Sequence, residues 1–136
     1  MKHKRAIIDT YQTTYNKDLV VCNAYVTVKQ IVKRYTYCDG KEIQENDFNN
    51  IDACCMLCVD KNTKKLVEVI YLCKCDSKMK DKAEVTDIIA HESVHAAMDI
   101  YNYISASVDL GNQEPFAYLV GYIANCVYKT YSKTWI

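Results

Sequence analysis

The segment His91-Glu92-Ser93-Val94-His95 lies inside a long run of helix-forming, largely apolar residues, and it constrains the fold more than any other stretch. Positions four apart lie on one face of an α-helix, one turn apart, so both imidazoles point the same way and can bind one metal ion. Glu92 is offset by one position, so its carboxylate can reach a water on that metal without being a ligand. The H-E-x-x-H pattern is typical of zinc hydrolases.

The helix around this motif is predicted to begin at Asp81 and to be buried on most sides. Asp81 is a good N-cap residue, and Glu84 follows three positions later, as in a capping box. Burial of the two histidines and Glu92 in apolar surroundings is costly unless a metal and its water satisfy them. The pattern therefore favours a functional site over a helix with incidental histidines. Apolar residues are distributed almost all round this helix: Val85, Ile88, Ile89, Val94, Ala96, Ala97, Met98, Ile100, Tyr101 and Ile104.

The N-terminal half is rich in strand-like segments. β-branched and aromatic residues predict strands over residues 5–15 and 19–22, with a turn at residues 16–18 between them. Residues 52–59 and 66–73 predict an antiparallel hairpin with a longer loop. The sequence thus predicts a small antiparallel sheet built from this half of the chain.

Two further segments have helical character. Residues 27–35 place apolar side chains at helical spacing, although their β-branched content leaves a strand as the alternative. Residues 41–50 are polar and predict a loop or a short helix. A last helix is predicted to begin after Asn112 as N-cap, with Pro115 in its first turn, where proline is tolerated. We therefore expect one α+β domain over residues 1–136, in which the sheet packs on two long C-terminal helices.

The charge balance and the apolar pattern exclude some partners. Acidic and basic side chains number 17 each, so net charge gives no argument for nucleic acid or an anionic membrane as a partner. No segment resembles a signal peptide, and the longest apolar stretch, residues 115–128, is too short to span a bilayer. We expect a cytoplasmic protein, and the sequence leaves its oligomeric state open.

Eight cysteines are many for this length, and without an export signal they are expected to be reduced thiols. In a hairpin about residues 61–63, Cys55 faces Ile70 and Cys73 pairs near Asp52, which leaves the thiols poorly clustered. Buried small apolar residues are therefore the favoured interpretation. The alternative is a structural zinc site formed by Cys55, Cys58, Cys73 and Cys75.

Two imidazoles leave a catalytic zinc site one protein ligand short. Glu114 is the leading candidate, because a helix hairpin can bring the first turn of the last helix beside His91 and His95. The alternative is that Glu114 only complements the helix dipole. Asp99, one turn after His95, is a second candidate, either as a ligand or as an acceptor for an imidazole N–H. Asp87 can accept in the same way, and a cysteine of the sheet can also complete the site.

The motif and residues 114–122, which read E-P-F-A-Y-L-V-G-Y, together resemble the gluzincin arrangement of H-E-x-x-H and a downstream helical Glu. More narrowly, they are similar to small H-E-x-x-H proteins of phage and prophage origin, whose last helix carries an E-x-x-A-Y-L-x-G-like segment. The resemblance covers about the last fifty residues. It departs from metzincins, because Met98 and Tyr101 stand where that group has a glycine and a third histidine.

The resemblance implies a zincin-like fold with zinc bound by His91, His95 and Glu114, and with Glu92 as the base. Zinc lowers the pKa of a bound water from about 16 toward 7, and Glu92 accepts the proton and later passes it to the leaving group. Tyr118, one turn after Glu114, is the first candidate for the donor that stabilises the oxyanion.

The sequence therefore predicts a zinc-dependent hydrolase, with a metallopeptidase acting on a peptide or protein substrate as the leading interpretation. Two weaker candidates for the oxyanion donor are Tyr101 and Tyr122. A free sheet edge beside the helix can hold an extended peptide by strand addition. One alternative is a non-catalytic zinc-binding protein of phage type that acts by binding a host protein. Another is a metal-dependent hydrolase with a substrate other than a peptide.

Overall fold

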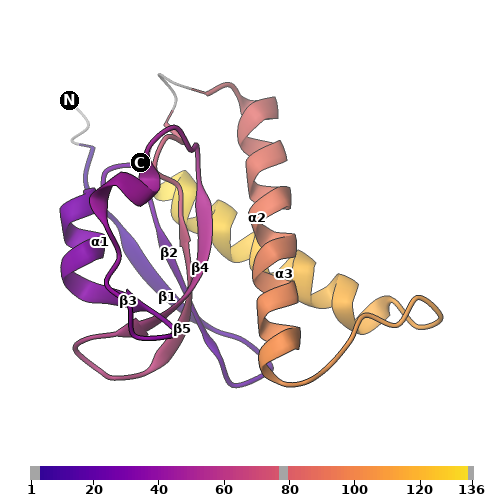
Figure 1. The fold of residues 1–136 in the computed structure, drawn as a ribbon. Coiled ribbons are helices and arrows are strands. Elements are labelled where there is room, and N and C mark those ends of the chain that lie inside the picture. The colour runs from indigo at the N-terminus through magenta and orange to yellow at the C-terminus, as the bar shows by residue number, and fades with distance from the viewer. Residues whose placement is uncertain (1–3, 77–79, 135–136) are drawn as a thin grey trace.

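The computed structural model describes residues 4–76 and 80–134, and it confirms the α+β class (Figure 1). The strands form one sheet in the order β1-β2-β5-β4-β3. The sheet comes from the N-terminal half and the two long helices from the C-terminal half. The elements are β1 (Ile8–Gln12), β2 (Asp18–Cys22), α1 (Val28–Arg34), β3 (Tyr35–Tyr37), the 3-10 helix η1 (Glu45–Phe48), β4 (Cys54–Asp60), β5 (Leu66–Tyr71), α2 (Lys82–Tyr103) and α3 (Glu114–Lys133).

The sheet is mostly antiparallel, with one parallel pair. β4 and β5 form the predicted hairpin, and Cys55 pairs with Ile70 in the predicted register. β2 and β5 are parallel neighbours, which the sequence analysis did not predict. The reason is the crossover: the chain leaves β2, passes through α1, β3 and β4, and returns beside β2 as β5.

Both faces of the sheet are covered, so the domain has three layers instead of the two expected (Figure 1). Leu19 and Val21 of β2 pack with apolar side chains of α2 and α3. Val20 and Cys22 pack on the opposite face with residues of α1 and η1. Successive side chains of a strand point to opposite faces, and a near-continuous apolar run is typical of a strand buried on both.

α1 confirms the helix predicted over residues 27–35. Thr27 caps it: its side chain accepts the backbone N–H of Gln30, and the Gln30 side chain accepts the backbone N–H of Thr27. The helix ends at Arg34 because the chain continues directly into β3, a short edge strand that was not predicted. β3 pairs with the last residues of β4, from Cys58 to Asp60, and Thr36 also forms a bridge with Glu42.

α2 begins as predicted, since the Asp81 side chain accepts a backbone N–H of the first turn at 2.8 Å. The prediction that it is buried on most sides is wrong. Val94 is 39% exposed and Met98 is 49% exposed, and His91 and His95 are exposed as well. α2 packs against the sheet and against α3, and these two contacts leave one side of the helix to solvent.

α3 begins at Glu114 with Gln113 as its N-cap residue, one position later than the predicted Asn112. Leu119, Ile123 and Val127 point into the core between α3, α2 and the sheet. Across residues 4–76 and 80–134, no helix combines the length and the apolar character needed to cross a membrane.

Candidate metal centre

Two adjoining hollows lie between α2 and the start of β4, with volumes of about 220 Å³ and about 290 Å³. They share Ala53 and Glu92 in their linings, so we treat them as one feature and call it the α2–β4 groove. Because α2 contributes residues one turn apart, the groove runs along the helix. Its lining residues are Ile51, Asp52, Ala53, Cys54, Cys55, Asp87, Ile88, His91, Glu92, His95 and Asp99.

The two histidines of the motif come together on the outer wall of this groove. The Nε2 atoms of His91 and His95 are 3.1 Å apart. Two nitrogens bound at 2.0–2.1 Å to a tetrahedral zinc ion are separated by about 3.3 Å, so the helix already holds them at the spacing that one ion needs. The His91 side chain is 63% exposed, so the pair is open to solvent.

Glu92 lies beside this pair but points toward the protein. It is only 8% exposed, and its Oε1 atom is 4.0 Å from Nε2 of His91. Burial raises the pKa of Glu92, and positive charge on His91 and His95 opposes that rise. A carboxylate whose pKa is raised is a stronger base than an ordinary one and is suited to accept a proton.

Glu114 and Tyr118 are not brought to the histidines. They line a different hollow on the outer side of α3, and Tyr118 is 74% exposed. The first turns of α3 meet α2 near its C-terminal end, where the rings of Tyr101 and Phe116 are 5.2 Å apart. That contact lies more than one turn beyond His95, which is why the following helix does not return to the motif.

The two weaker tyrosine candidates also lie away from the groove. The Tyr101 ring is part of the core, with Tyr15 on one side and Phe116 on the other. The Tyr122 hydroxyl donates to the backbone carbonyl of Gln12 in β1. Both therefore have structural contacts that account for them.

A second cluster lies deeper, between β4, β5 and α2, and it consists of Cys55, Glu68 and Asp99. Their ligand atoms all lie within 4.8 Å of one another. Among residues 4–76 and 80–134, these three residues form the group whose spacing could hold a metal ion. The Cys55 thiol donates to Oε1 of Glu68 at 2.7 Å and lies 3.9 Å from Oδ2 of Asp99.

Glu68 is fully buried, and its Oε2 atom has no hydrogen-bond donor in the part of the chain that the structure describes. Burial raises the pKa of Glu68 to about 9, and the Asp99 carboxyl adds to that rise. Burial and the neighbouring Glu68 likewise raise the pKa of Cys55. The positive charge of Lys17 lowers the pKa of Glu68. The ammonium group of Lys17 lies 3.5 Å from the ring centre of Tyr103.

The sequence analysis found part of this cluster. It named Asp99 and a sheet cysteine as rivals for the third ligand, and it missed Glu68. A lone acidic residue in the apolar run of a strand that is buried on both faces is the signal that would have found it.

The zinc site proposed for four cysteines is not assembled. Cys58 and Cys73 belong to the sheet face covered by α1, whereas Cys55 and Cys75 lie on the α2 face. Alternation along β4 separates Cys55 from Cys58, whereas Cys73 and Cys75 follow the end of β5. All eight cysteines are free, as expected, and Cys58 and Cys75 are buried.

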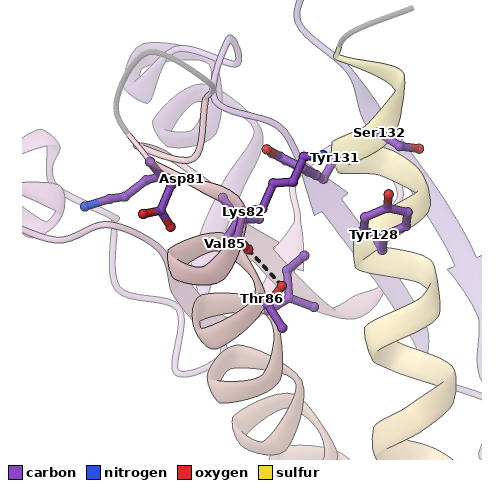
Figure 2. A pocket seen from close by; sticks show the side chains of 9 residues that line it. Asp81, Lys82, Val85, Thr86, Tyr128, Tyr131 and Ser132 are labelled. Carbon is purple, nitrogen blue, oxygen red and sulfur yellow. Dashed lines mark hydrogen bonds between the residues drawn. The ribbon is translucent and has the colours of Figure 1, made fainter.

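A wider hollow of about 650 Å³ lies between the first turns of α2 and the last turns of α3 (Figure 2). Val85 and Ile89 contribute apolar surface from α2, and Tyr128 and Tyr131 contribute from α3. Thr86 Oγ1 donates to the Lys82 carbonyl at 2.8 Å within the helix. This hollow contains none of the predicted site residues.

Comparison of the chain with protein-family models, with curated proteins and with solved structures finds no match. The gluzincin resemblance of the C-terminal half therefore stays a prediction from the residues themselves.

Proposed function

We propose that this protein is a zinc-dependent hydrolase, and specifically a metallopeptidase, whose site is the outer wall of the α2–β4 groove. His91 and His95 hold the ion and Glu92 acts as the base. The observation that carries the proposal is the 3.1 Å spacing of the two Nε2 atoms, with the buried Glu92 carboxyl 4.0 Å from one of them.

The residues of the groove have different roles in the proposed reaction. A zinc ion held by His91 and His95 would supply Lewis-acid polarisation of a carbonyl and a more acidic water. Glu92 takes up a proton on the side of the groove and returns it to the leaving group, which its raised pKa favours. Glu114 is not part of this proposal, since it lines another hollow. The two histidines are the protein ligands that the proposal assigns to the ion.

The edge of β4 supports an extended peptide as the substrate. On the outer side of β4, the carbonyl of Leu57 accepts the backbone N–H of Cys38 at 3.0 Å. Backbone groups alternate in direction along an antiparallel strand, so those of Cys55 point to the same outer side. β3 ends its pairing at Cys58, so in the described chain this stretch has no strand partner. A peptide added here would lie beside the groove.

A Glu92→Gln variant tests the proposal. We expect it to retain zinc and to lose about 10²–10⁴-fold in the rate of cleavage of a peptide library followed by mass spectrometry. Glu84→Gln is the matched control, because Glu84 is an exposed glutamate on the same helix outside the groove, and it should leave cleavage unchanged. Undiminished cleavage by the Glu92 variant, or by a His95→Ala variant that has lost its metal, would refute the proposal.

A non-catalytic zinc-binding protein is the second candidate, and one observation favours it. The described residues bring no third ligand atom into a cluster with the two imidazoles. A partner protein that offers a histidine, cysteine or carboxylate would complete such a site. In that case Glu92→Gln changes nothing, whereas His95→Ala abolishes the zinc-dependent complex in size-exclusion chromatography.

A further inference from the structure

We propose that Cys55, Glu68 and Asp99 form a second metal site, which binds a divalent ion of the zinc class separately from the histidine pair. The three residues come from β4, β5 and α2, so the site joins the hairpin to the helix. It does not depend on the hydrolase proposal, because no member belongs to the set His91, Glu92 and His95.

The distances within the cluster suit a tetrahedral ion. Zinc binds sulfur at about 2.3 Å and carboxylate oxygen at about 2.0–2.2 Å, so a thiolate sulfur and a carboxylate oxygen on one ion are about 3.5 Å apart. The observed separations from Cys55 Sγ are 2.7 Å to Glu68 and 3.9 Å to Asp99, which lie on either side of that value. Movements of about 1 Å at the tips of the side chains produce the ligand geometry.

The burial of Glu68 provides the second, independent argument. Its Oε2 atom has no donor among the described residues, and the groups around it are a thiol and another carboxyl. When ionised, all three groups are acceptors only, so they need either shared protons or a cation between them. A divalent cation satisfies the orphaned oxygen and both neighbours at once.

The surrounding charge fits a divalent ion. Three ionised ligands around such an ion carry one excess negative charge. Lys17 is 6% exposed, and its positive charge favours the ionised form of Glu68. It therefore offsets part of this excess negative charge. The thiolate selects zinc-like ions over magnesium or calcium, which prefer oxygen ligands only.

An ion can reach the cluster through the α2–β4 groove. Cys55 and Asp99 both line its hollow of about 290 Å³, together with His95 and Glu92. Glu68 lies beneath them as the fully buried ligand. The position that faces the groove is open to water or to a small anionic ligand.

Cobalt titration of the metal-free full chain tests the site, because a cobalt–thiolate bond gives a near-ultraviolet charge-transfer band that imidazole and carboxylate ligands do not give. We expect the band to saturate at one equivalent and to be displaced by zinc. It should persist in the double variant His91→Ala/His95→Ala, which separates this test from that of the hydrolase. Cys55→Ala should abolish it, and Glu68→Gln should weaken cobalt binding at least tenfold.

Cys38→Ala is the matched control, since Cys38 is an exposed thiol outside the groove and its loss should leave the band unchanged. Circular dichroism tests whether each variant is folded. If Cys55→Ala does not fold, Asp99→Asn replaces it, because Asp99 lies on the half-buried side of α2. This variant should also weaken cobalt binding at least tenfold. Absence of the band in the wild-type chain, or its survival in Cys55→Ala, overturns the proposal. Equal cobalt affinity of wild type and the Glu68 and Asp99 variants overturns it as well.

Discussion

The exposed histidine pair and the buried cluster of Cys55, Glu68 and Asp99 are supplied in part by the same helix, with His95 and Asp99 one turn apart. The imidazoles lie in solvent and cost little when no metal is bound. The buried carboxyls are removed from water, so their charge must be neutralised by protons or a cation. The exposed pair can therefore stay empty of metal at little cost to the free energy of unfolding. The buried cluster contributes to that free energy only to the extent that protons or a cation neutralise its charge.

The largest expected effect is the pH dependence that the buried cluster gives to the free energy of unfolding. In chelator-treated protein the folded-state pKa of Glu68, about 9, exceeds its ordinary value of 4.5, so the folded state holds a proton that the unfolded state has lost. The stability contributed by this group is complete below pH 4.5 and is lost as pH rises toward 9. The slope is at most about 1.4 kcal/mol per pH unit. Urea unfolding from pH 5 to 9 should show this loss for wild type, and Glu68→Gln should reduce it. Equal slopes for both proteins would contradict the assignment.

The next effect is stabilisation by zinc. With free zinc at about 1,000 times the dissociation constant, the free energy of unfolding should rise by about 4 kcal/mol through the buried cluster. The double variant His91→Ala/His95→Ala should keep this rise, whereas Cys55→Ala should lose it. Thermal unfolding with and without zinc measures both. A rise that disappears with the histidines instead would assign the stabilising ion to the exposed pair.

The exposed pair should matter far less for stability. In metal-free protein, replacing both histidines by alanine should change the free energy of unfolding by less than about 0.5 kcal/mol, because both side chains are exposed. Chemical denaturation with a chelator present measures this. A loss of 2 kcal/mol or more would show that the imidazoles support the fold and would break the contrast.

The smallest effect is expected at Glu114. Because it lines a separate hollow on α3, Glu114→Ala should leave the zinc affinity of the histidine pair unchanged within about twofold. Competition with a chromophoric chelator measures the affinity, and His95→Ala is the positive control. A loss of tenfold or more would restore Glu114 as the third ligand.

Local patterns predicted most of the elements. The predicted cap Asp81 marks a helix start that the structure confirms, and β4 and β5 pair in the predicted hairpin register. The strand β3 was missed because three residues are too few for a periodic signal. The parallel pairing of β2 with β5 depends on a crossover between distant segments, which no local pattern encodes.

The candidate site was predictable only where its members are close in sequence. Helical periodicity by itself places His91 and His95 on one face, with Glu92 beside them. The position of Glu114 depends on the angle at which α3 packs on α2, and that angle is set by contacts such as Tyr101 with Phe116. The sequence analysis therefore placed the three motif residues together, whereas the position of Glu114 relative to them depended on helix packing.

Helical periodicity is enough to place the two imidazoles on one face, because four residues make about one helical turn wherever the helix lies. The packing of the chain set which face of α2 is exposed, which cysteine meets a carboxylate, and that Oε2 of the buried Glu68 has no donor among the described residues. The physical reason is that helix geometry is local. Burial, and with it the cost of an unneutralised charge, is a property of the packed whole.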